Sequence, residues 1–154
     1  MDVKFVNPFI ESFRNVMSQL GFSDIKTGKL TVKEKTFSGK GVVITVGIVG
    51  QITGNIAYVI DTENAKKVAS QMMMGMPVEE LDPMSRSALS ELSNMLSANA
   101  ATSFSNLDVL IDISPPSFFE GDDIDVTMSS EKSLCIQLLA DGIAVDVNIS
   151  FDKI

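Results

Sequence analysis

Residues 85–100 read SRSALSELSNMLSANA, and the spacing of their apolar residues predicts one long amphipathic helix. A helix turns by about 100° per residue, so positions three or four apart lie on the same side. One side is apolar and is expected to face the core: Leu89, Leu92 and Leu96. The other side is expected to face outward as one row: Ser87, Glu91, Asn94 and Ala98. The helix therefore presents a carboxylate and an amide next to each other on its outer side.

The surroundings of this outward row are small side chains, whereas an ordinary solvated helix face carries many lysines and glutamates. The small neighbours are Ser87, Ser90, Ser97, Ala98 and Ala101. A flat face of this kind favours a docking surface with two polar groups at its centre. The Glu-x-x-Asn spacing alone also fits a plain solvated face, because it is short and common.

The rest of the chain divides into helices and strands around this segment. Three helices are expected. The first begins at Asn7 as N-cap and Pro8, runs to Leu20 and is ended by Gly21. The second begins at Thr62 as N-cap and runs to Met74, and the third runs from Asp82 and Pro83 to Phe104. Strands are expected at 28–37, 41–49, 55–60, 109–113, 125–128, 134–139 and 143–151, with a turn at 117–123. This order predicts an α+β fold in which long helices pack on a mainly antiparallel sheet.

The last two predicted strands form a hairpin, since Asp141-Gly142 between them is typical of a two-residue turn. Apolar and polar residues alternate along 143–151, so Asn148 and Ser150 are expected to face outward. A helix followed by strands occurs twice, at 7–60 and 82–152, which suggests an internal repeat. The two long helices would then lie side by side on the sheet.

Length and composition indicate a single globular domain over residues 1–154, with 45% hydrophobic and 21% charged residues. Neither a signal peptide nor an apolar run near the ~20 residues of a membrane helix is expected. The single cysteine, Cys135, excludes an internal disulfide and favours a reducing, cytoplasmic setting. The absence of histidine excludes His-based triads and phosphohistidine relays.

Charge is unevenly distributed along the chain, whose net charge is −8. Residues 1–75 contain 9 Lys/Arg and 6 Asp/Glu (+3), and residues 76–154 contain 3 Lys/Arg and 14 Asp/Glu (−11). The acidic half holds the outward row, which argues against nucleic-acid binding and favours a partner with a basic patch.

Three other patterns have simpler explanations than a functional site. The methionines of 72–76 fit packing at a helix end better than a soft-metal site. The acidic residues of 120–125 miss the EF-hand spacing and fit a solvated turn. Cys135 lacks a histidine partner and fits a buried structural thiol. No metal site is expected in this chain.

The segment Ser87-x3-Glu91-x2-Asn94 resembles the signature of the CheC/CheX/FliY phosphatases of bacterial chemotaxis. The resemblance extends over the whole chain, including NPFIESF at 7–13. The family signature also has a proline about 22 residues after the asparagine. That position is Ser117 here, and the prolines are Pro115 and Pro116.

The resemblance implies hydrolysis of the aspartyl phosphate of a CheY-type response regulator, whose own active site holds Mg²⁺ and a lysine. It implies that Asn94 orients the attacking water and that Glu91 pairs with the regulator's lysine. Ser87, Ser90, Ala98 and Pro116 would contact the regulator. It further implies a homodimer. The first helix has Arg14 where a second signature would have asparagine, so one working site is expected.

Two other functions remain open from the sequence. A non-catalytic adaptor could bind a flagellar-switch or signalling protein through the same helix face. A third interpretation is a structural dimer without any functional site, in which a sheet edge pairs with a second copy. The charged residues KEK at 33–35 argue against such edge-to-edge pairing at that strand.

Overall fold

A computed structural model describes residues 3–153, which form three α-helices, one short 3₁₀ helix and five strands. In chain order these elements are η1 (Val3–Phe5), α1 (Asn7–Gln19), β1 (Ile25–Gly50), β2 (Thr53–Ile60), α2 (Thr62–Met72), α3 (Pro83–Asn106), β3 (Ile111–Ile113), β4 (Ser117–Ala140) and β5 (Ile143–Lys153). The strands follow the order β2-β5-β4-β1-β3, all neighbours are antiparallel, and β1 also pairs with β2. The α+β architecture with an antiparallel sheet is as predicted.

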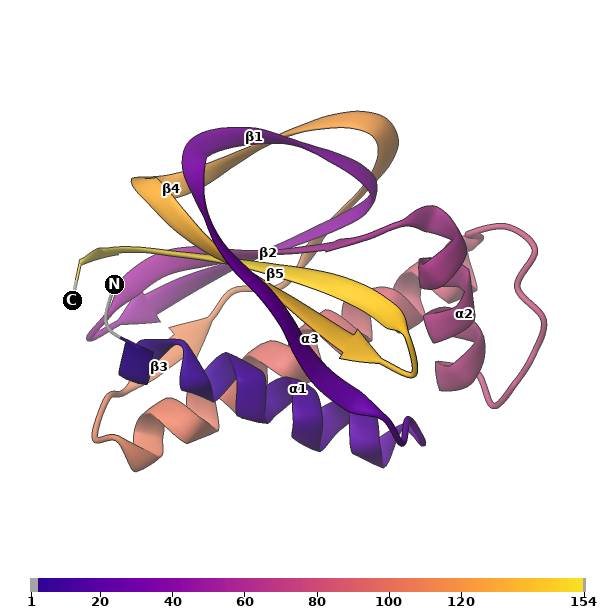
Figure 1. The fold of residues 1–154 in the computed structure, drawn as a ribbon, viewed down its shortest axis with the longest axis horizontal. Helices are drawn as coiled ribbons and strands as arrows, with labels where there is room; N and C mark the ends of the chain where they lie inside the picture. Colours follow the sequence, from indigo (N-terminus) through magenta and orange to yellow (C-terminus); the bar gives the residue numbers. More distant parts are fainter. Residues whose placement is uncertain (1–2, 154) are drawn as a thin grey trace.

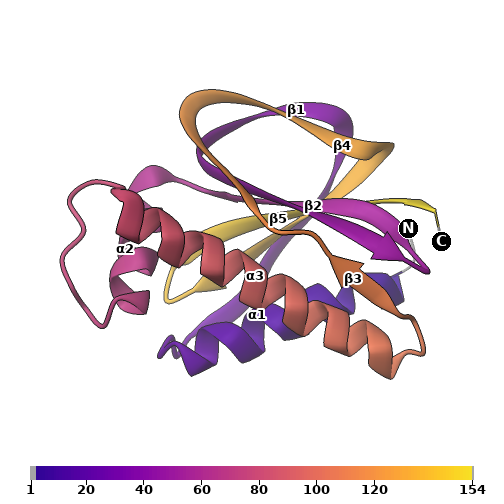
Figure 2. The ribbon, with the colours of Figure 1, turned by 180° about the vertical axis from the view of Figure 1, so that it is seen from behind.

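Helices α1 and α3 lie side by side on one face of the sheet, and α2 lies at one end (Figures 1 and 2). The hydroxyl of Ser12 on α1 donates to the carbonyl of Leu96 on α3, and Asn15 Nδ2 donates to Asn99 Oδ1 at 3.3 Å. The predicted adjacency of the first and last helices is therefore confirmed. Among residues 3–153, no helix is long and apolar enough to span a membrane.

The sheet has a hydrophobic core on each face. The larger core lies between the sheet and the helices, and it includes an aromatic cluster of Phe5, Phe9, Phe104 and Phe151. The smaller core consists of Val43, Ala57, Val126 and Met128. It lies on the other face, where the middle parts of β1 and β4 curl over the sheet as a ribbon (Figure 1). The ribbon thus supplies the second face with its own apolar cover.

The strand boundaries correct several predictions. The predicted strands at 28–37 and 41–49 are one strand, β1, and the predicted turn at 117–123 lies within β4. Residues 117–121 pair with 41–45 of β1, for example Ile44 with Phe118. Pairing with a strand segment about 75 residues away in the sequence outweighs the local preference of Gly121 and its acidic neighbours for a turn. The predicted strand at 109–113 shortens to β3.

The helix ends also differ in part from the prediction. Val6 rather than Asn7 is the N-cap of α1, and none of the side chains that the structure describes caps that helix. Asp61 rather than Thr62 caps α2, where it accepts a hydrogen bond from the Asn64 N–H at 2.7 Å, and α2 ends at Met72. Asp82 caps α3 as predicted, accepting from the Ser85 N–H at 2.8 Å.

Asn148 and Ser150 of β5 are buried rather than outward-facing. The alternation along β5 holds, but the ribbon covers the face that was expected to meet solvent. Asn148 Nδ2 donates to the Ala57 carbonyl, and Ser150 Oγ lies 2.6 Å from the Ser130 hydroxyl. Burial of polar side chains is tolerated here because most of their groups have partners.

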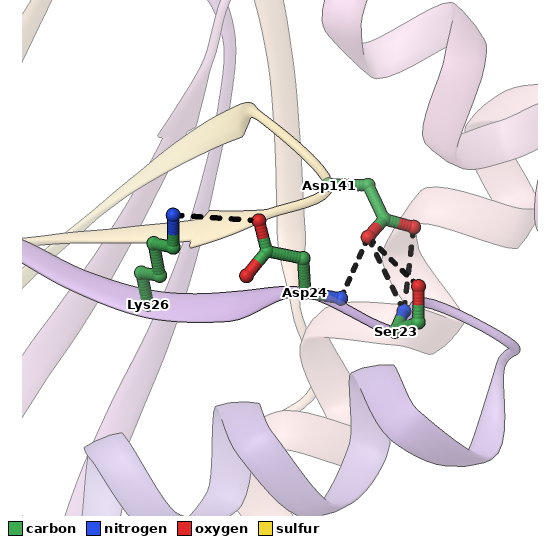
Figure 3. A network of polar contacts seen from close by, with 4 residues as sticks. All are labelled: Ser23, Asp24, Lys26 and Asp141. Atoms are coloured by element: carbon green, nitrogen blue, oxygen red, sulfur yellow. Dashed lines mark hydrogen bonds and ion pairs between the residues drawn. The ribbon is translucent and has the colours of Figure 1, made fainter.

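The β4–β5 hairpin turns at Asp141 and Gly142, as predicted, with φ values of 49° and 83°. Positive φ at both turn residues is the geometry that favours Asp-Gly. The Asp141 carboxylate accepts hydrogen bonds from the N–H groups of Asp24, at 2.7 Å, and Ser23, at 3.3 Å (Figure 3). The turn thereby holds the chain where it leaves α1 and enters β1.

Candidate functional site

Helix α3 presents the predicted outward row on the side opposite the core. Ser87, Glu91 and Ala98 are exposed and Asn94 is half-buried, whereas the predicted core residues Leu89, Leu92 and Leu96 are buried. Pro83 and the Asp82 cap set the helix start, so the row begins in the second turn of the helix. The 3.6-residue periodicity therefore predicted the orientation of these side chains correctly.

Ser97 corrects one detail of that prediction, because it is buried rather than part of the small-residue face. Its hydroxyl lies 2.8 Å from the Tyr58 hydroxyl of β2, within hydrogen-bond distance. Burial raises the pKa of Tyr58 above its ordinary value, although the hydrogen bond with Ser97 opposes this. The Tyr58–Ser97 pair fixes α3 on the sheet from behind the outward row.

A shallow depression of about 560 Å³ lies beside the outward row. Its lining comes from α3, from the end of β3 and from the segment that joins β3 to β4: Arg86, Ser87, Ser90, Glu91, Asn94, Ile113, Ser114, Pro115 and Pro116. The structure therefore brings Pro116, and Pro115 with it, next to Glu91 and Asn94. Ala98 lies further along the helix and is not part of the lining.

The second wall of the depression is held by the sheet. Ile113 of β3 pairs with Ile48 of β1, and the Ser114 N–H donates to the Gly47 carbonyl at 3.0 Å. The Gly47 N–H in turn donates to Ser114 Oγ at 2.7 Å. These bonds hold Ser114 against β1 and thereby place the two prolines that follow it opposite α3.

Arg86 and Ser114 are site residues that the sequence analysis missed. Arg86 Nη2 lies 2.9 Å from Glu120 Oε1, Arg86 Nε donates to the Leu81 carbonyl at 2.9 Å, and the guanidinium lies over the Phe118 ring. The arginine thus links the start of α3 to the start of β4. The sequence could have identified Arg86 as a candidate site residue, because it adjoins Ser87 and is one of three Lys/Arg in the acidic half, residues 76–154.

The side chains of Glu91 and Asn94 make no hydrogen bond or ion pair with any of the residues 3–153 that the structure describes. Both are therefore available to an external partner. A carboxylate can accept a cationic side chain, and an amide can accept from and donate to a water molecule. Within the same described range, no three His, Cys, Asp or Glu side chains gather in a way that could hold a metal ion.

Nucleophilic catalysis by this chain has little support from the site. Cys135 is buried in β4, and burial raises the pKa of its thiol, which disfavours the reactive thiolate. The serines that line the depression have no histidine to activate them, because the chain has none. The arrangement is suited to positioning a water molecule and a partner.

Comparison with solved structures places the fold among CheC-like domains. A CheC-like superfamily protein from Shewanella sp. PV-4 superposes with a TM-score of 0.86 at 23% identity, over 99% of both chains. The structure of the CheX-CheY-BeF3-Mg²⁺ complex from Borrelia burgdorferi matches with a TM-score of 0.81 at 27% identity, over 96% of this chain and 97% of that chain.

The sequence comparisons define the family more narrowly. The family model described as chemotaxis phosphatase CheX matches residues 42–139. The CheY-P phosphatase CheX of Thermotoga maritima is 35% identical over 127 residues, which are 82% of this chain and 81% of that protein. The chain belongs to the CheX family of chemotaxis phosphatases, and it is accordingly a hydrolase.

Proposed function

We propose that this protein hydrolyses the aspartyl phosphate of a phosphorylated CheY-type response regulator. The observation that carries the proposal is the pair Glu91 and Asn94, neighbours on the outer side of α3, with no partner in the described chain and beside an open depression. The family relative in T. maritima is a CheY-P phosphatase, which supports the same substrate.

The regulator is expected to bring most of the charge that the reaction needs. Phosphoryl transfer depends mainly on positioning and on neutralising charge around the phosphoryl group. The B. burgdorferi complex contains CheY, Mg²⁺ and BeF3 together with CheX. We infer that Mg²⁺ belongs to the regulator's active site, so this chain needs to contribute only a placed water molecule.

Asn94 is proposed to orient that water for attack on phosphorus. Its carbonyl oxygen accepts a hydrogen bond from the water and its NH₂ can donate one, and neither group changes its charge during the reaction. As the water oxygen bonds to phosphorus, the P–O bond to the aspartyl oxygen breaks, the regulator's aspartate leaves as a carboxylate, and both water protons end on the inorganic phosphate that is released. Holding the water in line converts an encounter with bulk solvent into an oriented attack.

Glu91 is proposed to fix the docked regulator through an ion pair with the regulator's active-site lysine. Glu91 lies one turn before Asn94, so the pair would set the distance between Asn94 and the phosphoryl group. Ser87, Ser90 and Ala98 are small and would let the regulator's backbone approach α3. Pro116 would contact the regulator from the opposite wall.

The test is phosphate release from a phosphorylated CheY-type regulator by the wild type, Asn94→Ala and Glu91→Ala. Asn94→Ala is expected to lower kcat by about 100-fold with little change in regulator affinity, because positioning is lost and docking is kept. Glu91→Ala is expected to weaken regulator binding. Glu11→Ala, an exposed glutamate of α1, is the matched control and should behave as the wild type.

The result that contradicts the proposal is a wild-type protein that binds the regulator without shortening the lifetime of its phosphate. The non-catalytic adaptor would then be the better description. Equal turnover by the wild type and Asn94→Ala would instead remove Asn94 from the mechanism and leave the activity in place.

We also propose a homodimer, which the family resemblance implies. Leu30 and Val32 of β1 are exposed apolar residues, at 57% and 65%, and offer a surface for a second copy. Sedimentation equilibrium checks this: a mass near the 16.6 kDa of one chain would contradict it.

A further inference from the structure

The rim of the depression contains a charged residue that the proposed chemistry does not use. Of the nine described residues that line it, Arg86 is the one cation. It lies five residues before Glu91 and eight before Asn94, or about 7.5 Å and about 12 Å along the axis of α3. Arg86 therefore lies beyond Glu91, on the side away from the proposed water, and is placed to meet the regulator's surface rather than the phosphoryl group.

The geometry around Arg86 holds it in place without using up its donors. A guanidinium has five N–H donors, and only two of them have partners among residues 3–153: the Leu81 carbonyl and Glu120. The side chain remains 49% exposed. An arginine fixed in this way can bind a second carboxylate while it keeps the first, with less loss of side-chain entropy than a free one.

The charge of the surrounding chain explains why a cation is needed there. Residues 76–154 carry a net charge of −11, and Glu91 and Glu120 lie at or next to the depression. A regulator phosphorylated on aspartate and binding Mg²⁺ presents carboxylates around its active site. The regulator's lysine is proposed to pair with Glu91, and without Arg86 the carboxylates of the regulator would have no cation to meet at this rim.

We propose that Arg86 is a docking residue that pairs with an acidic side chain at the rim of the regulator's phosphorylation site. The inference rests on the proposed function for the identity of the partner. Arg86 sets affinity and partner choice, and it takes no part in the attack on phosphorus.

Binding is measured against a CheY-type regulator carrying Mg²⁺ and beryllofluoride, a mimic of the phosphorylated state that does not turn over. Arg86→Gln is expected to raise the Kd by about fivefold and to flatten its dependence on salt between about 50 mM and about 300 mM. Arg14→Gln, the same change at an exposed site on α1, is the control for net charge and should leave the Kd unchanged.

Glu120→Gln separates docking from a purely structural ion pair. Both Arg86→Gln and Glu120→Gln break the same contact within the chain, so a structural role predicts that they shift the Kd in the same direction. Docking predicts opposite effects, because Glu120→Gln leaves Arg86 with its full charge and should tighten binding. Thermal unfolding followed by circular dichroism checks that both variants fold.

Matching Kd values for Arg86→Gln and Arg14→Gln would overturn the inference, as would parallel losses in Arg86→Gln and Glu120→Gln. These outcomes are independent of turnover. Weak binding by Arg86→Gln in a protein that never releases phosphate would contradict the proposed function and support the docking role.

Discussion

At the scale of single residues, the exposed and the buried polar side chains of α3 have different roles. Glu91 and Asn94 reach solvent and their side chains have no polar partner among residues 3–153, while Ser97, on the same helix, is buried against Tyr58. Periodicity predicted the first two correctly. It placed Ser97 on the small-residue face because a serine pattern does not reveal that a tyrosine hydroxyl lies opposite. Whether a serine of α3 is buried depends on the side chain that faces it from the sheet.

Tyr58 gives a prediction for stability at alkaline pH. Burial raises the pKa of its phenol in the folded protein, so above pH ~10 the unfolded chain ionises this group while the folded chain does not. The free energy of unfolding should therefore fall as the pH rises above ~10. Tyr58 is the chain's single tyrosine, so Tyr58→Phe should lack this component.

Urea unfolding of the wild type and Tyr58→Phe at about pH 8 and about pH 11 measures the effect, with circular dichroism as the probe. The two proteins differ only in the phenol hydroxyl, so contributions common to both cancel in the comparison. An equal loss of stability in both proteins at the higher pH would contradict the assignment.

At the scale of elements, the long strands are the part that local patterns described least well. Residues 117–123 contain Gly121 and two aspartates, a composition typical of a turn, yet they continue β4. Their conformation follows from pairing with β1, which lies far away in sequence. The Asp141-Gly142 turn was predictable because its geometry depends on those two residues alone.

The Asp141 turn should make a measurable contribution to acid stability. Hydrogen bonds from the Asp24 and Ser23 N–H groups lower the pKa of Asp141 in the folded protein (Figure 3). The stabilisation is present above the unfolded pKa of ~3.9 and is lost as the pH falls through the lower folded value. Asp141→Asn keeps the turn geometry but should lower stability at neutral pH and weaken its decline in acid.

Chemical unfolding at a series of pH values from about 7 to about 2.5 tests this prediction. Asp24→Asn is the matched control, because Asp24 takes part through its backbone N–H, and among residues 3–153 its side chain makes only an exposed ion pair with Lys26. Coinciding pH profiles for Asp141→Asn and the wild type would show that the hydrogen bonds contribute nothing.

At the scale of the whole molecule, the sheet separates the proposed site from the smaller core. Helix α3, which carries the outward row, lies on one side of the sheet, and the curled β1–β4 ribbon lies on the other side (Figures 1 and 2). The ribbon covers Val43 and Ala57 with Val126 and Met128. A change in this core is therefore expected to affect stability and to leave the site intact.

Met128→Ala tests that separation. Met128 is 1% exposed, and truncating a buried methionine costs about 3 kcal/mol through lost burial and a residual cavity. At temperatures where the variant remains folded, its kcat on a phosphorylated regulator should equal that of the wild type. Met76→Ala, at an exposed methionine, is the control and should change neither quantity.

Urea unfolding and phosphate release on the same preparations provide the two measurements. A folded Met128→Ala protein with a lowered kcat would mean that the ribbon and α3 are coupled. An unchanged free energy of unfolding would mean that the smaller core contributes little to stability.

The sequence by itself determined the helices, the outward row with Glu91 and Asn94, the Asp141-Gly142 hairpin and the family. The helices, the outward row and the hairpin depend on residues close together in the chain, where periodicity and turn chemistry act locally, whereas the family resemblance extends over the whole chain. The tertiary structure alone decided the wall of Ser114 and the two prolines, the position of Arg86 beside Glu120, and the burial of Asn148 and Ser150. These features depend on pairing between distant strands, which local patterns do not specify.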